Sequence, residues 1–259
     1  MPELREWPNY SQADTQNMIQ AIVRSVRCEL RNAVTKVVNN DLDAARQRQT
    51  GKTYSNFLDN WGAEVLLTFT IVEKSTTNPN VLLTPASPAS SVFTLAAGLD
   101  LSAQATRIEK MNLFYTVREL YLPKGVICDA SGEQRYDSFL IQNNLKIADL
   151  FYGRMGSAVL GNASLPQAQD KNVLSHEISF QVVSSGGVSP TWTLTRAAIN
   201  PTGTLLGGSR DRTHDLLITF GPLDKPRGGR SLIAIAEQAH FSSQIASGVS
   251  NGFRSSLAR

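Results

Sequence analysis

The spacing of apolar residues predicts helices near both ends of the chain and one in its middle. Over 14–40, apolar residues recur at steps of three and four, which is typical of an amphipathic helix with one apolar stripe. The same spacing over 231–247 predicts a second amphipathic helix. Residues 137–156 have a broader apolar face and predict a third helix, ended by Gly153 and Gly156.

Strict alternation of apolar and polar residues predicts strands between these helices. The most regular stretch covers 92–106, and alternation resumes over 111–120 after an expected turn at 107–110. Strands this close in sequence usually pair, so an antiparallel hairpin is predicted here. Further strands are expected at 63–73, 178–183, 191–195 and 216–220, with connections at 74–91, 184–187 and 200–209.

These elements predict an α+β fold. Its centre is an antiparallel, β-sandwich-like sheet of about six strands (estimated from the alternation), flanked by the N- and C-terminal amphipathic helices. No repeat and no composition break divides the chain. Residues 1–259 are therefore expected to form a single β-rich domain, a length that such sheets reach as one unit.

Composition and charge exclude several classes of protein. Hydrophobic residues make up 41% of the chain, which is enough for a core and argues against global disorder. The 25 basic residues face 22 acidic ones without a dense basic stripe, so no nucleic-acid partner is expected. The first residues have no apolar stretch after a basic start, so the chain as given is expected to carry no signal peptide. No apolar window is long enough for a transmembrane helix.

The two cysteines leave two interpretations open. Cys28 lies in the predicted first helix and Cys128 in a loop-like stretch, and together they match no metal-ligand spacing. Cys28 is either a buried thiol or one half of a Cys28–Cys128 bridge. The bridge requires an oxidising compartment, and the sequence does not decide between the two.

No catalytic residue, metal site or cofactor is expected from the motifs. The three histidines, His176, His214 and His240, have no partner at a ligand spacing on a shared face. No Gly-x-Ser-x-Gly elbow is present, and the glycine-rich segment 203–210 lacks the lysine and the following helix of a P-loop.

One small basic patch is the best candidate for binding an acidic group. It comprises Arg196, Arg210, Arg212 and His214, around the glycine-rich loop. The plainer interpretation is a solvated junction between a loop and a strand. Within a strand, His214 and Asp215 point to opposite faces, so they are not expected to touch.

Four segments together resemble uncharacterised β-rich, envelope-type proteins of proteobacteria, which look secreted or lipoprotein-like. The segments are Cys28-Glu29-Leu30, Phe57 to Val65, Pro190 to Leu194 and Thr213 to Phe220. The resemblance implies a bacterial protein of the envelope or the extracellular space. It implies no activity, cofactor or catalytic residue, and this chain departs from the pattern because it lacks a signal peptide.

Three functional hypotheses follow. The first is a non-enzymatic structural or interaction protein, a self-associating subunit of a larger homo-oligomeric assembly. The alternative is a ligand-binding module or an unrecognised hydrolase with its site near Arg196, Arg210 and His214. The third is an envelope-surface protein with a membrane-contacting hairpin at 92–120. Membrane contact is not expected, because that hairpin is alanine-rich at one end, has few comparable strands and has no aromatic girdle.

Overall fold

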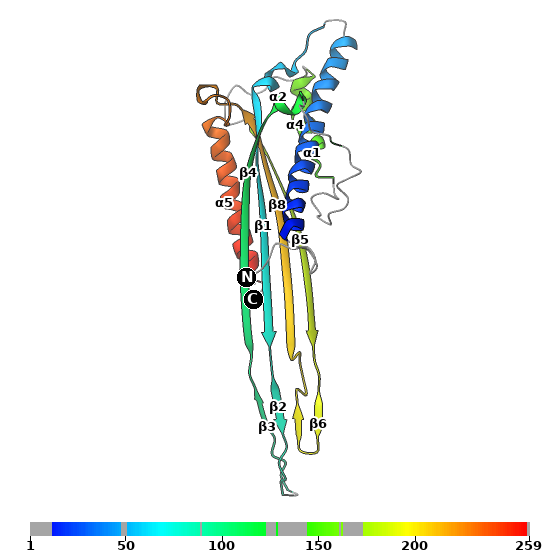
Figure 1. Cartoon of the computed structure of the whole chain (residues 1–259), viewed down its shortest axis with the longest axis vertical. Coiled ribbons are helices and arrows are strands. Elements are labelled where there is room, and N and C mark those ends of the chain that lie inside the picture. Colours follow the sequence, from blue (N-terminus) through cyan, green and yellow to red (C-terminus); the bar gives the residue numbers. More distant parts are fainter. Residues whose placement is uncertain are drawn as a thin grey trace. The chain divides into compact units, whose positions relative to one another are not determined.

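The computed structural model describes residues 12–47, 51–88, 90–122, 128, 144–160, 162 and 173–257 (Figure 1). In chain order, the elements are α1 (Gln12–Gln47), the 3-10 helix η1 (Ser55–Asn60), β1 (Trp61–Thr77), β2 (Asn80–Leu83), β3 (Leu95–Gly98), β4 (Leu101–Thr116), α2 (Val117–Tyr121), α4 (Ile147–Val159), β5 (Leu174–Val188), β6 (Trp192–Leu194), β7 (Ala197–Ile199), β8 (Leu206–Pro222), the 3-10 helix η4 (Lys225–Arg227) and α5 (Ala234–Leu257).

The strands form two antiparallel sheets of four strands each. One has the order β4-β1-β8-β5 and the other the order β3-β2-β7-β6. The predicted α+β class with antiparallel sheets is therefore confirmed. The prediction of about six strands in one sheet is wrong, because β2 lies in the predicted connection at 74–91 and β7 lies between the predicted strand at 191–195 and the predicted loop at 200–209.

The chain forms two compact units, and β1, β4, β5 and β8 contribute residues to both. The hairpin unit is defined here as the described residues of Phe69–Glu109 and Gln181–His214. The helical unit is defined as the described residues of Arg5–Thr68, Lys110–Phe180 and Asp215–Arg259.

In the helical unit, helices cover both faces of the sheet. The Phe220 ring on β8 lies 4.6 Å from the Phe151 ring on α4, whereas the neighbouring Thr219 bonds His240 on α5. Adjacent residues of a strand point to opposite faces, so α4 and α5 lie on opposite faces of this sheet (Figure 1). Helix α1 packs against α4 and α2. The apolar core is concentrated here, with Phe220 fully buried.

A disulfide ties α1 to a distant part of the chain. Cys28 on α1 bonds Cys128, with an Sγ–Sγ distance of 2.02 Å and 100 residues of sequence between the two positions. The bridge that the sequence left open is therefore formed.

The strands of the small sheet follow the same order as those of the large one, with β3, β2, β7 and β6 in the places of β4, β1, β8 and β5. The Asn78 N–H donates to the Leu205 carbonyl at 2.8 Å, which joins the two sides beyond β1 and β8. The Asn80 amide donates to the Asn200 side chain at 3.1 Å, and Asn200, which is buried with a φ of 52°, donates to the Pro190 carbonyl at 2.8 Å. These side-chain bonds fix the positions where β2 and β7 begin and end.

The predicted turn at 107–110 is wrong, because residues 101–116 form the single strand β4. Residues 107–110 contain no glycine, proline or asparagine, and the apolar residues on both sides of them keep odd positions, so the alternation does not change phase. The strand ends at Thr116, whose hydroxyl accepts from the Glu119 N–H in a capping box that starts α2. The hairpin expected at 92–120 therefore does not exist as such.

Several other boundaries differ from the predictions. Strand β5 runs through the expected turn at 184–187, and β8 begins inside the expected loop at 200–209. Helix α4 starts at Ile147, after the left-handed residue Lys146, and continues past Gly153 and Gly156. The first part of the predicted helix, 137–143, lies outside the described residues. Helices α1 and α5 are confirmed; α1 extends beyond both ends of its predicted range, whereas α5 begins three residues later than predicted and continues to Leu257.

Candidate functional site

The structure brings three of the four predicted site residues together. Arg210, Arg212 and His214 alternate along β8 and so share one face of that strand. Arg196 lies in the turn between β6 and β7. The Arg210 guanidinium lies 3.5 Å from the Glu73 carboxylate on β1. A site for an acidic ligand at these residues stays a prediction.

His214 is buried, whereas the plainer interpretation of the sequence placed it at a solvated junction. The residue is 6% exposed, and its ring meets the Phe69 ring edge-on with centroids 5.0 Å apart. Burial lowers the pKa of His214 to about 4, and the positive charge of Arg212 acts in the same direction. The imidazole is therefore neutral at neutral pH and serves as a packed core group.

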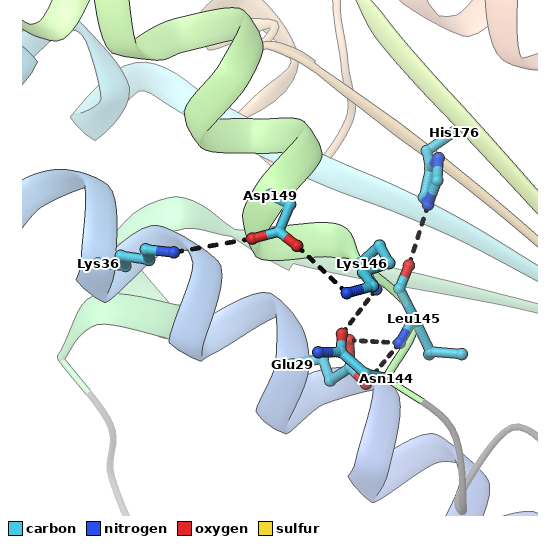
Figure 2. Close-up of polar contacts among 7 residues, drawn as sticks. All are labelled: Glu29, Lys36, Asn144, Leu145, Lys146, Asp149 and His176. Carbon is cyan, nitrogen blue, oxygen red and sulfur yellow. Dashed lines mark hydrogen bonds and ion pairs between the residues drawn. The ribbon is translucent and has the colours of Figure 1, made fainter.

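A second polar cluster joins α1, α4 and β5 in the helical unit (Figure 2). Both carboxylate oxygens of Glu29 accept from the Leu145 N–H, at 3.0 and 3.2 Å, and the Leu145 carbonyl lies 3.1 Å from the His176 ring. Burial raises the pKa of Glu29, although the Leu145 bond opposes the shift. Figure 2 also shows Asp149 between Lys36 and Lys146, at 3.7 and 3.6 Å. This arrangement fixes the start of α4.

Glu29→Ala is expected to lower the free energy of unfolding by about 1–3 kcal/mol, because the buried Leu145 N–H would lose its acceptor. Glu29→Gln keeps one acceptor oxygen and should cost clearly less. Urea unfolding followed by circular dichroism compares the two variants. Equal losses for Ala and Gln would show that the bond to Leu145 does not carry the effect.

A cavity of about 370 Å³ lies between α1 and β4 in the helical unit. The Arg27 guanidinium, which lines it, lies 5.8 Å from the centre of the Tyr115 ring, so a cation–π contact already engages both groups. Burial raises the pKa of Tyr115, and Arg27 opposes that shift. The remaining lining residues are Ile19, Gln20, Val23, Arg24, Met111 and Leu113.

Helix α5 turns a polar face toward the sheet. His240, which is 2% exposed, shares a 2.8 Å hydrogen bond with the Thr219 hydroxyl. Further along the same face, the Ser243 hydroxyl lies 3.5 Å from the hydroxyl of Ser175 on β5, and Ser247 donates to Glu177. Burial lowers the pKa of His240, which favours the neutral form of this imidazole.

The outer face of α5 is apolar and exposed. Phe241, Ile245, Val249 and Phe253 recur at steps of four residues and are 60%, 52%, 53% and 65% exposed. These four residues are called the α5 stripe below. A surface helix normally buries its apolar face and exposes its polar face, so α5 beyond His240 is inverted. Contiguous exposed apolar residues of this kind mark interaction surfaces.

The sequence shows the spacing of the apolar residues of this surface but does not show whether they face the solvent or the protein interior. The predicted C-terminal helix covered 231–247, so it included Phe241 and Ile245 but ended before Val249 and Phe253, which lie in the extension of α5 to Leu257. Periodicity shows which residues share a face of a helix and does not show whether that face is inside or outside.

The described helices include none that is both long and apolar enough to cross a membrane. Among the described residues, no three His, Cys, Asp or Glu side chains are grouped to hold a metal ion. In comparisons with known proteins, no family model matches the chain and no curated protein matches it.

Proposed function

We propose that this chain is a non-enzymatic subunit of a homo-oligomeric assembly and that copies meet through the α5 stripe. The inverted polarity of α5 carries the proposal. Beyond the buried Ala236, hydrogen bonds to Thr219, Ser175 and Glu177 hold the inner face of α5 on the sheet. The four large apolar side chains of the stripe then remain for contact with a partner.

The composition of the stripe suits contact with an identical surface. In a symmetric dimer, a surface patch meets its own copy, so charged residues would face like charges. Residues 241–253 include no charged residue. Gly252 lies within the arc of the stripe and Gly248 lies about 20° beyond its edge, because about 100° of rotation is added per residue. A Cβ atom built on either glycine meets nothing within 4 Å, which leaves room for the close approach of a second helix.

The disulfide supports an oxidising compartment for the proposed assembly. Such bonds persist in the bacterial envelope and outside the cell and are rare in the cytosol. This agrees with the envelope location that the resemblance of the sequence implies.

Ile245→Glu combined with Val249→Glu is expected to weaken self-association by at least about tenfold, because carboxylates would be buried against their own copies. Sedimentation velocity over a dilution series measures the change. Ser250→Glu is the matched control, since Ser250 is exposed on the same helix but lies outside the stripe. All variants should melt at the temperature of the parent protein, because the changed side chains are exposed.

Unchanged association in the double variant would contradict the α5 contact. Equal weakening by Ser250→Glu would show that added negative charge, and not loss of the stripe, dissociates the assembly. An association that is weakened only by the double variant supports the proposal.

A further inference from the structure

The hairpin unit has no apolar core around its small sheet. None of the described residues of β2, β3, β6 and β7 is buried. The buried residues of the unit are Phe69, Ile71, Asn200 and His214, and none of them belongs to those strands. A sheet normally needs at least one covered face to be stable in water. Both faces of this sheet are open.

One face of the small sheet is entirely apolar. Residues that pair directly across strands share a face. Leu83 pairs with Leu95 and Ala197, and Ala197 pairs with Leu194; two residues further along each strand, Val81, Ala97, Ile199 and Trp192 form the same kind of row. These eight residues are called the apolar sheet face below. Val81 is half-buried, and the other large members are exposed, from 39% for Leu83 to 61% for Leu194.

The sequence around this face is nearly free of charge. No charged residue occurs from Ser75 to Leu99 or from Gln181 to Thr195, and none occurs from Ala197 to Ser209. The charges that interrupt these runs lie outside the strands, Asp100 between β3 and β4 and Arg196 in the turn between β6 and β7.

Charged residues occur on β1, β4 and β8 next to the ends of the uncharged runs. Glu73 on β1 pairs with Arg210 on β8, Asp211 accepts from Gln181 on β5, and Arg107 pairs with a neighbouring glutamate on β4. Protein interfaces usually have a polar rim around their core, and exposed edge strands usually carry charge. Strands without any charged residue instead suit an apolar face that contacts hydrocarbon, because hydrocarbon solvates no ion.

We propose that the apolar sheet face of the two hairpins contacts the hydrocarbon of a lipid bilayer. Residues Ser75 to Leu83, which include the end of β1 and all of β2, carry no charge, so the apolar sheet face can meet hydrocarbon without burying an ion there. Trp192 and the exposed tip residue Phe93 supply the aromatic groups that favour the lipid–water boundary. The third hypothesis from the sequence placed a membrane-contacting hairpin at 92–120, and membrane contact was not expected; the uncharged zone instead joins two separate hairpins.

The two edges of the small sheet must also be paired inside a membrane, and this part of the inference rests on the proposed self-association. Strands β3 and β6 are the edge strands, and unpaired N–H and carbonyl groups are very costly inside hydrocarbon. We therefore expect membrane-bound copies to pair through these edges. Self-association through the α5 stripe is measured without lipid, whereas membrane contact is measured with vesicles, so failure of one proposal can be told from failure of the other.

Flotation of the full chain with neutral phosphatidylcholine vesicles tests the inference. Binding is expected at about 0.15 M and about 0.5 M NaCl alike, because uncharged strands gain nothing from electrostatic attraction. Trp192 emission should shift to shorter wavelength on binding, and Trp192→Phe should remove that shift. Leu95→Lys combined with Leu194→Lys is expected to weaken binding by at least about tenfold.

Thr193→Lys is the matched control, because Thr193 lies between Trp192 and Leu194 on β6 but pairs with Ala198 on the opposite face. It should weaken binding much less than the double lysine variant. No flotation of the parent protein, or equal flotation of the double variant, would overturn the inference. Loss of self-association without lipid in the double variant would identify a second copy as the partner of this face instead.

Discussion

Replacing Cys28 and Cys128 together with alanine is expected to lower the free energy of unfolding by about 4–5 kcal/mol. The disulfide closes a loop across a sequence separation of 100 residues, and in the chain-entropy account a loop of this length restricts the unfolded chain strongly. The effect is large compared with the total stability of an ordinary domain. The reduced protein should therefore be close to unfolding at growth temperature.

Urea unfolding with and without a thiol reductant measures this effect. The reductant should destabilise the parent protein by about the amount lost in the double alanine variant, and it should leave that variant unchanged. Alanine is a better replacement than serine, because Cys28 is only 9% exposed and the serine hydroxyl would need a hydrogen-bond partner there. A loss below about 1 kcal/mol would contradict a structural role for the bridge.

Acidification from pH 6.5 to pH 4 is expected to cost about 3 kcal/mol of stability through His214. Burial lowers the pKa of this side chain from its ordinary value of 6.5 to about 4 in the folded protein. Between these values the unfolded chain binds the proton and the folded chain does not, so stability falls as the pH falls. The contribution is complete above pH 6.5 and is lost by about pH 4.

The comparison with His214→Gln isolates this contribution. Burial lowers the pKa of His240, which acts in the same direction, whereas burial raises the pKa of Glu29 and Glu64, which opposes it. Those groups are present in both proteins, so the difference between the two curves of unfolding free energy against pH belongs to His214. Parallel curves from pH 6.5 to pH 4 would contradict a buried, neutral imidazole.

The long elements of the helical unit were predictable because one physical signal dominates each. Helix α1 buries Ile22, Val26 and Leu30 completely, and their spacing is that of one helix face. Strand β1 and the second half of β8 lie between helices and so read as apolar runs with clear ends. Gly221-Pro222 closes β8 at the position where the sequence predicted its end.

The hairpin unit was harder to predict because its strands bury no core. Strand β7 is three residues long and follows the turn at Arg196, so its alternation is too brief to recognise. Ser184 to Gly187 are turn-forming residues by composition, yet pairing keeps them in β5. Exposure on both faces removes the contrast between inner and outer residues on which strand prediction depends.

The two proposed surfaces were visible in the sequence only as unassigned apolar residues. The α5 stripe needed the contacts of His240 and Ser243 to show that the helix is inverted. The apolar sheet face needed the cross-strand register, because its members come from four separate strands. Neither the partner surface nor the pairing of distant strands follows from local periodicity.

The mass of the native, disulfide-bonded particle tests the central claim of self-association most directly. Light scattering behind a sizing column, without lipid or detergent, is expected to give a defined multiple of 28.2 kDa that falls toward the single-chain mass in the Ile245→Glu, Val249→Glu variant. A constant mass of 28.2 kDa for the parent protein across a wide range of concentration would contradict the account.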